Sequence, residues 1–182
     1  MIEAKVTGIP DLREALRGIV PKLRVRALRN ALAAGARVVQ RAAREATPVI
    51  SASALAVRRG YRKPGTVRKA ISVRTSKVAR RNGDVGVFVN VRPAKKGNRG
   101  AKNPNDPFYW RFIEFGTTAR KAGERSSVAG GRSRLHKRTT GATRAFKFLQ
   151  AGAGRLPEAL EVFKARIARD IAKLNKPKAP PP

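Results

Sequence analysis

Positive charge far exceeds negative charge in this sequence, which limits both how the chain can fold and what it can bind. The 182 residues include 42 lysines and arginines against 11 aspartates and glutamates, for a formal net charge of +31. A compact chain with this charge repels itself and attracts polyanions. Because the charges occur along the whole chain and are mostly of one sign, they differ from an ordinary solvated surface. We expect nucleic acid, or an assembly containing it, beside this protein; an anionic membrane surface or an acidic protein is the alternative.

The rest of the composition fits one soluble globular domain. A length of 182 residues suits a single domain with a moderate core. The absence of cysteine excludes a disulfide framework and a thiolate metal site. No apolar segment follows Met1–Lys5, and no stretch approaches about 18 uninterrupted apolar residues. We therefore expect neither a secretory signal nor a transmembrane helix.

The N-terminal part of the chain predicts a short strand and two helices. Residues 2–7 alternate as in a strand, and Asp11 stands where a carboxylate can cap the start of a first helix. A long second helix is predicted from Pro21 to about Ala46. Apolar and small residues recur there every three to four positions, whereas arginines occupy the other face. Pro48 is expected to end it.

A β-hairpin is predicted in the middle of the chain. Residues 66–70 form one helical turn that leads into a strand from Ile71 to Val78, and a return strand runs from Val85 to Val91 with its odd-numbered valines on one face. Residues 81–84, which contain an Asn-Gly pair, are the strongest short-range hairpin signal in the sequence. We therefore expect the chain to reverse direction there.

Two basic loops flank an aromatic segment in the C-terminal half. Residues 93–107 are polar, and residues 118–143 contain too few apolar side chains to order themselves, so we expect the second loop to be mobile. Between them, Phe108–Thr117 holds five of the ten aromatic residues. Their spacing favours a core position over a base-stacking surface, and Gly116 is suited to cap a short helix. An amphipathic helix is predicted to follow from Pro157.

Side chains that could support catalysis or bind a metal are scarce. His136 is the one histidine and lies in the second loop, where we expect it to be solvated. Most acidic residues are isolated from one another, and Gly130-Gly131 lacks the lysine and hydroxyl of a phosphate-binding loop. Glu114 lies within the aromatic segment, so we expect it to be buried and paired with an arginine. The sequence therefore predicts a protein that is not an enzyme and has no cofactor.

These elements, taken in order, resemble the tail-completion or head–tail joining proteins of long-tailed, siphovirus-type bacteriophages. The segment Tyr109–Thr117 resembles that family's Tyr-x-x-Phe-x-Glu-Phe-Gly-Thr signature. Ala145–Leu149 resembles its later Pro-Phe-Leu segment, although alanine stands in place of the proline. The arginine-rich helix ending before Pro48 and the segment Gly65–Ile71 occur in the same order as in the family. The resemblance covers nearly the whole chain, but both basic loops look longer than usual and the proline-rich tail at 176–182 is additional.

This resemblance implies an α+β fold and a structural role in the virion. A small antiparallel sheet with a β-hairpin would pack against the long N-terminal helix and the C-terminal helix in a single domain over residues 1–175, with long basic loops. The protein would complete the tail end in the phage neck and join the tail to the DNA-filled head, as a ring around the DNA channel. A non-specific nucleic-acid-binding protein, of the chromatin or ribosomal kind, is the alternative that the charge alone supports.

The resemblance also implies partners and a location. The partners would be further copies of the chain in a hexamer, neighbouring neck, connector, tail-terminator or tail-tube proteins, and packaged DNA, with no membrane. The protein would assemble in the host cytoplasm and remain in the virion.

Two sets of residues follow as candidates for the functional site. The family motif and its core comprise Tyr109, Phe112, Glu114, Phe115, Gly116, Thr117, Phe146 and Phe148. The candidate contacts to DNA or partner proteins are basic residues of the two loops, namely Lys95, Lys96, Arg99, Lys102, Arg120, Lys121, Arg125, Arg132, Arg134, Lys137 and Arg138.

Overall fold

A computed structural model describes residues 21–119, 121–123 and 139–174, and these residues form an α+β fold as predicted. The expected strand at 2–7, the capping Asp11 and the tail at 176–182 lie outside the described residues.

The elements gather in two compact units, each discontinuous in sequence. The first contains Met1–Glu45, Ile71–Arg92 and Leu149–Pro182, and the second contains Ala46–Ala70 and Pro93–Phe148. The expectation of a single domain over residues 1–175 stays a prediction.

Two long helices pack together in the first unit. Helix α2 spans Pro21–Ala46, the predicted bounds, and helix α8 spans Leu156–Leu174. A small cluster joins them, in which Ala27, Ala31 and Ile167 are buried and Leu28, Phe163 and Ile171 pack around them. A Cβ atom on Gly35 would lie 2.5 Å from the carbonyl oxygen of Ala159, so a glycine at this crossing lets the two helices touch. The amphipathic patterns that predicted both helices therefore identify the faces that meet.

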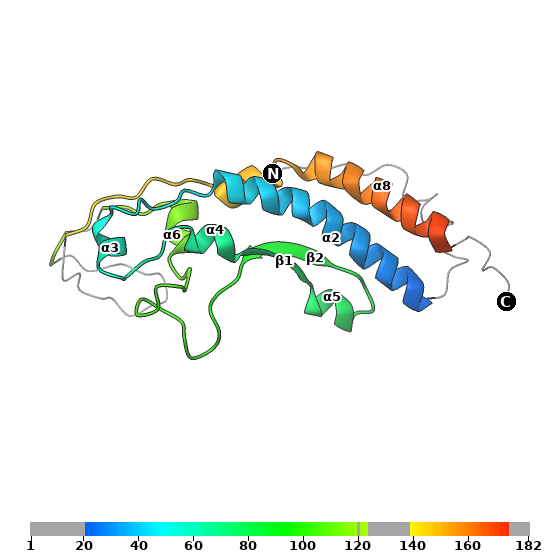
Figure 1. The fold of residues 1–182 in the computed structure, drawn as a ribbon, viewed down its shortest axis with the longest axis horizontal. Helices are drawn as coiled ribbons and strands as arrows, with labels where there is room; N and C mark the ends of the chain where they lie inside the picture. The colour runs from blue at the N-terminus through cyan, green and yellow to red at the C-terminus, as the bar shows by residue number, and fades with distance from the viewer. Residues whose placement is uncertain (1–20, 120, 124–138, 175–182) are drawn as a thin grey trace. The chain divides into compact units, whose positions relative to one another are not determined.

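A two-stranded antiparallel sheet lies on the other side of α2 (Figure 1). Strand β1, Ile71–Thr75, pairs with strand β2, Val87–Val91, so that Ile71 lies opposite Val91 and Thr75 opposite Val87. Ile71 and Val91 are both buried, whereas Phe88 is exposed on the opposite face, as the alternation predicted. The side-chain amide of Gln40 and the guanidinium of Arg44 each donate to the Ile71 carbonyl oxygen at 2.8 Å. These two bonds fasten the start of β1 to α2.

The connection between the strands differs from the predicted hairpin turn. Strand β1 ends at Thr75, and a short helix, α5, runs from Lys77 to Arg81 where the strand was expected to continue. Ser76 caps this helix, because its hydroxyl accepts a hydrogen bond from the Ala79 amide at 3.1 Å.

The Asn-Gly pair lies at the end of this helix. Asn82 is the C-cap, and Gly83 follows with a φ of +78°. The Asn-Gly pair therefore terminates a helix, and the return strand begins only at Val87.

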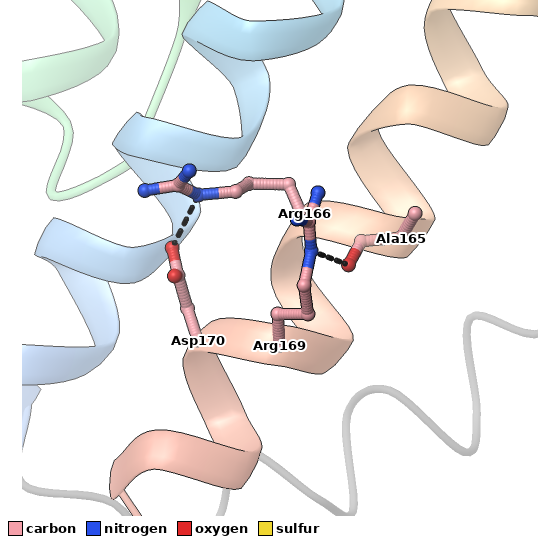
Figure 2. A network of polar contacts seen from close by, with 4 residues as sticks. All are labelled: Ala165, Arg166, Arg169 and Asp170. Atoms are coloured by element: carbon pink, nitrogen blue, oxygen red, sulfur yellow. Dashed lines mark hydrogen bonds and ion pairs between the residues drawn. The ribbon is translucent and has the colours of Figure 1, made fainter.

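Helix α8 contains ion pairs between its own side chains. Figure 2 shows Arg166, whose Nε lies 3.2 Å from the Asp170 carboxylate, and Arg169, whose Nε donates to the Ala165 carbonyl at 3.3 Å. Lys164 pairs in the same way with Glu161, at 2.9 Å. Ion pairs within one helix typically each contribute only a few tenths of a kcal/mol, so apolar packing against α2 matters more for the position of the helix.

Short helices and long connections make up the second unit. Its helices are α3 (Leu55–Arg58), α4 (Thr66–Ala70) and α6 (Trp110–Phe115), and α7 (Phe148–Ala153) begins at its last residue. The helical turn predicted at 66–70 is therefore confirmed. Val67 and Phe148 supply buried apolar side chains here.

Candidate functional site

Helix α6 holds most of the sequence motif, and Gly116 ends it as predicted. Gly116 has a φ of +72°, and a Cβ atom there would lie 2.7 Å from the Thr143 carbonyl oxygen and 2.9 Å from the Ala145 nitrogen. A side chain is therefore excluded both by backbone conformation and by space. The next residue, Thr117, exchanges two backbone hydrogen bonds with Thr143, at 2.9 and 3.0 Å.

The second motif segment closes onto the end of α6. The amide of Phe146 donates to the Ile113 carbonyl at 2.9 Å, and the amide of Lys147 donates to the Glu114 carbonyl at 3.1 Å. Phe148 is fully buried, which confirms that the segment from Ala145 returns to the core. Two segments about thirty residues apart in the sequence therefore form one structure.

Three aromatic side chains of the motif region are exposed, contrary to the expectation that they belong to the core. Phe112 is 48% exposed, Phe115 is 73% exposed and Phe146 is 44% exposed. Phe112 and Phe115 are three residues apart and so share one face of the short helix. Glu114, by contrast, is buried as predicted, at 5% exposure, while its expected arginine partner stays a prediction. The apolar face of α6 is thus presented outward while its carboxylate is inside.

A groove of about 410 Å³ lies beside this helix within the second unit. Apolar side chains from four separate segments line it, among them Val49, Ile50, Val67, Ile113 and Phe146. Val49 and Ile50 are themselves exposed, and together with the three phenylalanines they give the second unit many apolar side chains in contact with water. Exposed apolar patches of this kind mark binding sites on soluble proteins.

Arg62, which lines the groove, lies against two aromatic rings. The Arg62 guanidinium lies 4.7 Å from the centre of the Phe108 ring and 4.9 Å from that of Tyr109, and the two rings meet edge to face. Burial raises the pKa of the Tyr109 hydroxyl above its ordinary value of 10.0, while the positive charge of Arg62 and a hydrogen bond with Thr66 oppose this shift. Arg62 is thus the cation nearest to an otherwise apolar surface.

A buried carboxylate organises the basic loop at 93–107. Asp106 is 1% exposed and accepts hydrogen bonds from the amides of Ala94, at 3.1 Å, and Gly100, at 2.5 Å. From the sequence, Asp106 was expected to be one of several isolated acidic residues without a particular role. Asp106 could have been identified from the sequence because it is the one acidic residue of the loop at 93–107. The four predicted contact residues of this loop are exposed: Lys95, Lys96, Arg99 and Lys102.

The other predicted contacts fall mostly outside the described residues. Lys121 is exposed. The remainder lie in the part of the second loop that the structure does not describe: Arg120, Arg125, Arg132, Arg134, Lys137, Arg138 and also His136. Within the described ranges, no group of three or more histidine, cysteine, aspartate or glutamate residues could hold a metal ion. No helix in the same ranges is long and apolar enough to cross a membrane.

The comparisons with known proteins point to one family. Residues 11–116, more than half of the chain, match the family model described as "Bacteriophage HK97-gp10, putative tail-component". The matched segment includes α2, the sheet and α6, and it ends at Gly116. No curated protein and no solved structure matches the chain significantly.

Proposed function

The chain belongs to the HK97 gp10-like family of bacteriophage tail components, and from this premise we propose that it completes the head-proximal end of the tail and joins the tail to the DNA-filled head. In this role, copies of the chain form a ring around the channel through which DNA passes. The observation that supports an assembly role most directly is the exposed apolar surface around the family motif.

That apolar surface has the properties of a protein interface. Phe115 at 73% exposure and Phe112 at 48% exposure leave large aromatic areas in water, and Phe146, also exposed, lines the groove. Transferring such a side chain from water into an interface contributes about 1.5–3 kcal/mol. Aromatic residues at the centre of an interface also contribute a large share of binding energy. Exposed aromatic side chains are therefore expected in a subunit that functions only within a larger assembly.

The charge of the chain supports a position beside DNA. Lys95, Lys96, Arg99 and Lys102 are all exposed on one loop, and the net charge is +31. Basic side chains without a base-reading motif bind phosphates irrespective of sequence, and their binding weakens steeply as salt rises. A ring of such subunits would hold DNA in a channel without a preferred sequence.

The joining role is tested by removing the chain from an infection. Phage lacking it should yield filled heads and separate tails by electron microscopy, and the wild-type chain supplied in trans should restore joined particles. Joined particles in normal number without the chain would overturn the proposal.

Phe115→Ser tests the apolar surface within the same assay. Because Phe115 is mostly exposed, the variant should change the free energy of unfolding by no more than about 0.5 kcal/mol, measured by urea unfolding. It should nevertheless fail to restore joining. Val78→Ser, at a site 67% exposed in the first unit, is the matched control and should restore it. Equal complementation by both variants would show that the aromatic surface is not an assembly contact.

The charge also favours a second candidate, a protein that coats nucleic acid without joining any assembly. Titration of the purified chain with duplex DNA at increasing salt, with the particle mass measured in parallel, separates the two. Monomers that coat DNA favour the second candidate. A ring in solution, or binding restricted to tail ends, favours the joining role.

A further inference from the structure

The first unit contains a groove of a different character from the apolar one. It has a volume of about 400 Å³ and lies between α2 and the sheet. Its lining includes Arg29 and Arg37 from α2 and Val73, Arg74 and Thr75 from β1, with no acidic residue among the side chains that form it. All three arginines are exposed. The groove is therefore a positively charged channel with a strand along one wall.

Within the described residues, one edge of the strand on that wall has no strand paired with it. In an antiparallel pair, alternate residues direct their amide and carbonyl groups toward the partner strand. The Ser76 amide donates to the Gly86 carbonyl at 2.8 Å, which shows that even-numbered positions of this segment face β2. The Ile71 carbonyl, by contrast, accepts its bonds from α2. Val73 and Thr75 share the orientation of Ile71, so their backbone groups point away from β2, and both residues line the groove.

Nothing in the described sheet pairs with this edge. The sheet has two strands in the order β1-β2, so β1 has a neighbour on one side only. Beyond the two bonds at Ile71, the groove occupies the space along β1. An unpaired edge with free donors and acceptors is a template for an added strand. This edge is positioned to accept an extended segment from another molecule.

Charge and size decide among the possible occupants. A further copy of this chain is disfavoured, because it has a net charge of +31 and only 11 acidic residues. A DNA duplex is wider than its own major groove, which is about 12 Å across, so it could lie over a groove of about 400 Å³ but not enter it. A segment of extended polypeptide fits the groove, and its carboxylates would complement the arginines.

We propose that the groove between α2 and β1 binds an extended acidic segment of a partner protein, which adds a strand to the edge of β1 at Val73 and Thr75. Carboxylates of that segment lie against Arg29, Arg37 and Arg74. The inference goes beyond the joining role, and it holds or fails independently of where in the virion the chain acts.

In the test, a ten-residue peptide of alternating glutamate and valine is titrated into the full chain. The salt concentration is about 0.15 M, because long-range attraction between exposed charges is screened there. In nuclear magnetic resonance spectra of the labelled protein, the amide signals of Val73 and Thr75 should shift when the peptide is added. The same amides should exchange their hydrogen with water more slowly. A peptide of alternating lysine and valine should not bind.

Two sets of variants separate strand pairing from simple attraction of charge. Replacing Arg29, Arg37 and Arg74 by glutamate should weaken binding at least tenfold. The control replaces three exposed arginines outside the groove in the same way, Arg80, Arg81 and Arg92, and should weaken binding much less.

Thr75→Pro removes one edge amide without removing a bond to β2, because proline is tolerated on the free edge of a strand. It should weaken binding at least tenfold, whereas Thr75→Val should not. Unchanged β1 and β2 amide signals in the unbound Thr75→Pro protein would show that the sheet is intact.

Three results would overturn the proposal. The first is an equal loss of peptide affinity in both triple-arginine variants. The second is unchanged affinity in Thr75→Pro with the sheet intact. The third is a peptide that leaves the Val73 and Thr75 amides unmoved while a DNA duplex shifts them, which would assign the groove to phosphates. None of these results bears on whether heads and tails join, so the two proposals can fail separately.

Discussion

At the scale of single residues, Gly116 connects the two parts of the family motif. Gly116→Ala should lower the free energy of unfolding by about 2 kcal/mol or more, because the new side chain adds backbone strain and meets the Thr143 carbonyl. Urea unfolding of the full chain measures this change. Gly141→Ala, at a position with open space around it, is the control and should change stability by about 0.5 kcal/mol or less. Equal effects would contradict the role given to Gly116.

Tyr109 should make stability depend on alkaline pH. Burial raises the pKa of its hydroxyl above 10.0, so the unfolded chain releases the phenolic proton first as the pH rises. The stability that the neutral hydroxyl contributes is therefore fully present below about pH 10 and is lost as the pH passes through the raised pKa of the folded state. Tyr109→Phe should make the decline shallower in unfolding measurements from about pH 9 to pH 11. An unchanged decline would contradict this assignment.

The sequence predicted the environment of a residue correctly where the residues next to it in the chain determine whether it is buried. It did not predict that environment where the face of a short helix or hydrogen bonds to backbone groups determine it. The burial of Glu114 followed from the aromatic residues around it. The exposure of Phe115 could not be predicted, because a helix of six residues is too short for its periodicity to show which face is buried. The role of Asp106 was missed because its partners are backbone amides, which any residue provides.

At the scale of elements, long periodic helices were predicted well and the tight connection was not. Helices α2 and α8 extend over 26 and 19 residues, so their apolar spacing repeats several times. The Asn-Gly pair was expected to turn a hairpin, but Ser76 offers a helix cap six residues earlier. That local hydrogen bond ends the strand before the turn signal is reached. The strand pairing itself was predicted correctly, because the valine alternation fixes which face is buried.

The close contact between α2 and α8 predicts that a larger side chain at Gly35 lowers the stability of the protein. Alanine is favoured over glycine inside a helix by about 1 kcal/mol, yet Gly35→Ala should destabilise the protein. Its Cβ would lie 2.5 Å from the Ala159 carbonyl oxygen, which is backbone and can move only with α8. Thermal unfolding should show a lower midpoint for the variant. Ala168→Gly, at an exposed site on α8, measures the propensity effect alone. A midpoint raised by Gly35→Ala would show that the helices are not in contact here.

At the scale of the whole molecule, two kinds of surface accompany the +31 charge. One is the apolar surface of the second unit, around Phe115 and the family motif. The other is the arginine-lined groove of the first unit, beside the free edge of β1. Of these two surfaces, a chain that bound only nucleic acid would not need the apolar one. Their presence in a member of a phage tail-component family supports a subunit that contacts several neighbours in an assembly.

The joining role requires that the chain lie at one defined position in the finished particle. Electron cryomicroscopy of purified virions, with a tag fused to the chain to mark it, should place a ring of copies at the head-proximal end of the tail, surrounding the DNA channel. The apolar surface around Phe115 should lie in a subunit contact. Density for the chain at the tail tip, along the tail tube as single copies, or nowhere in the virion would contradict the joining role.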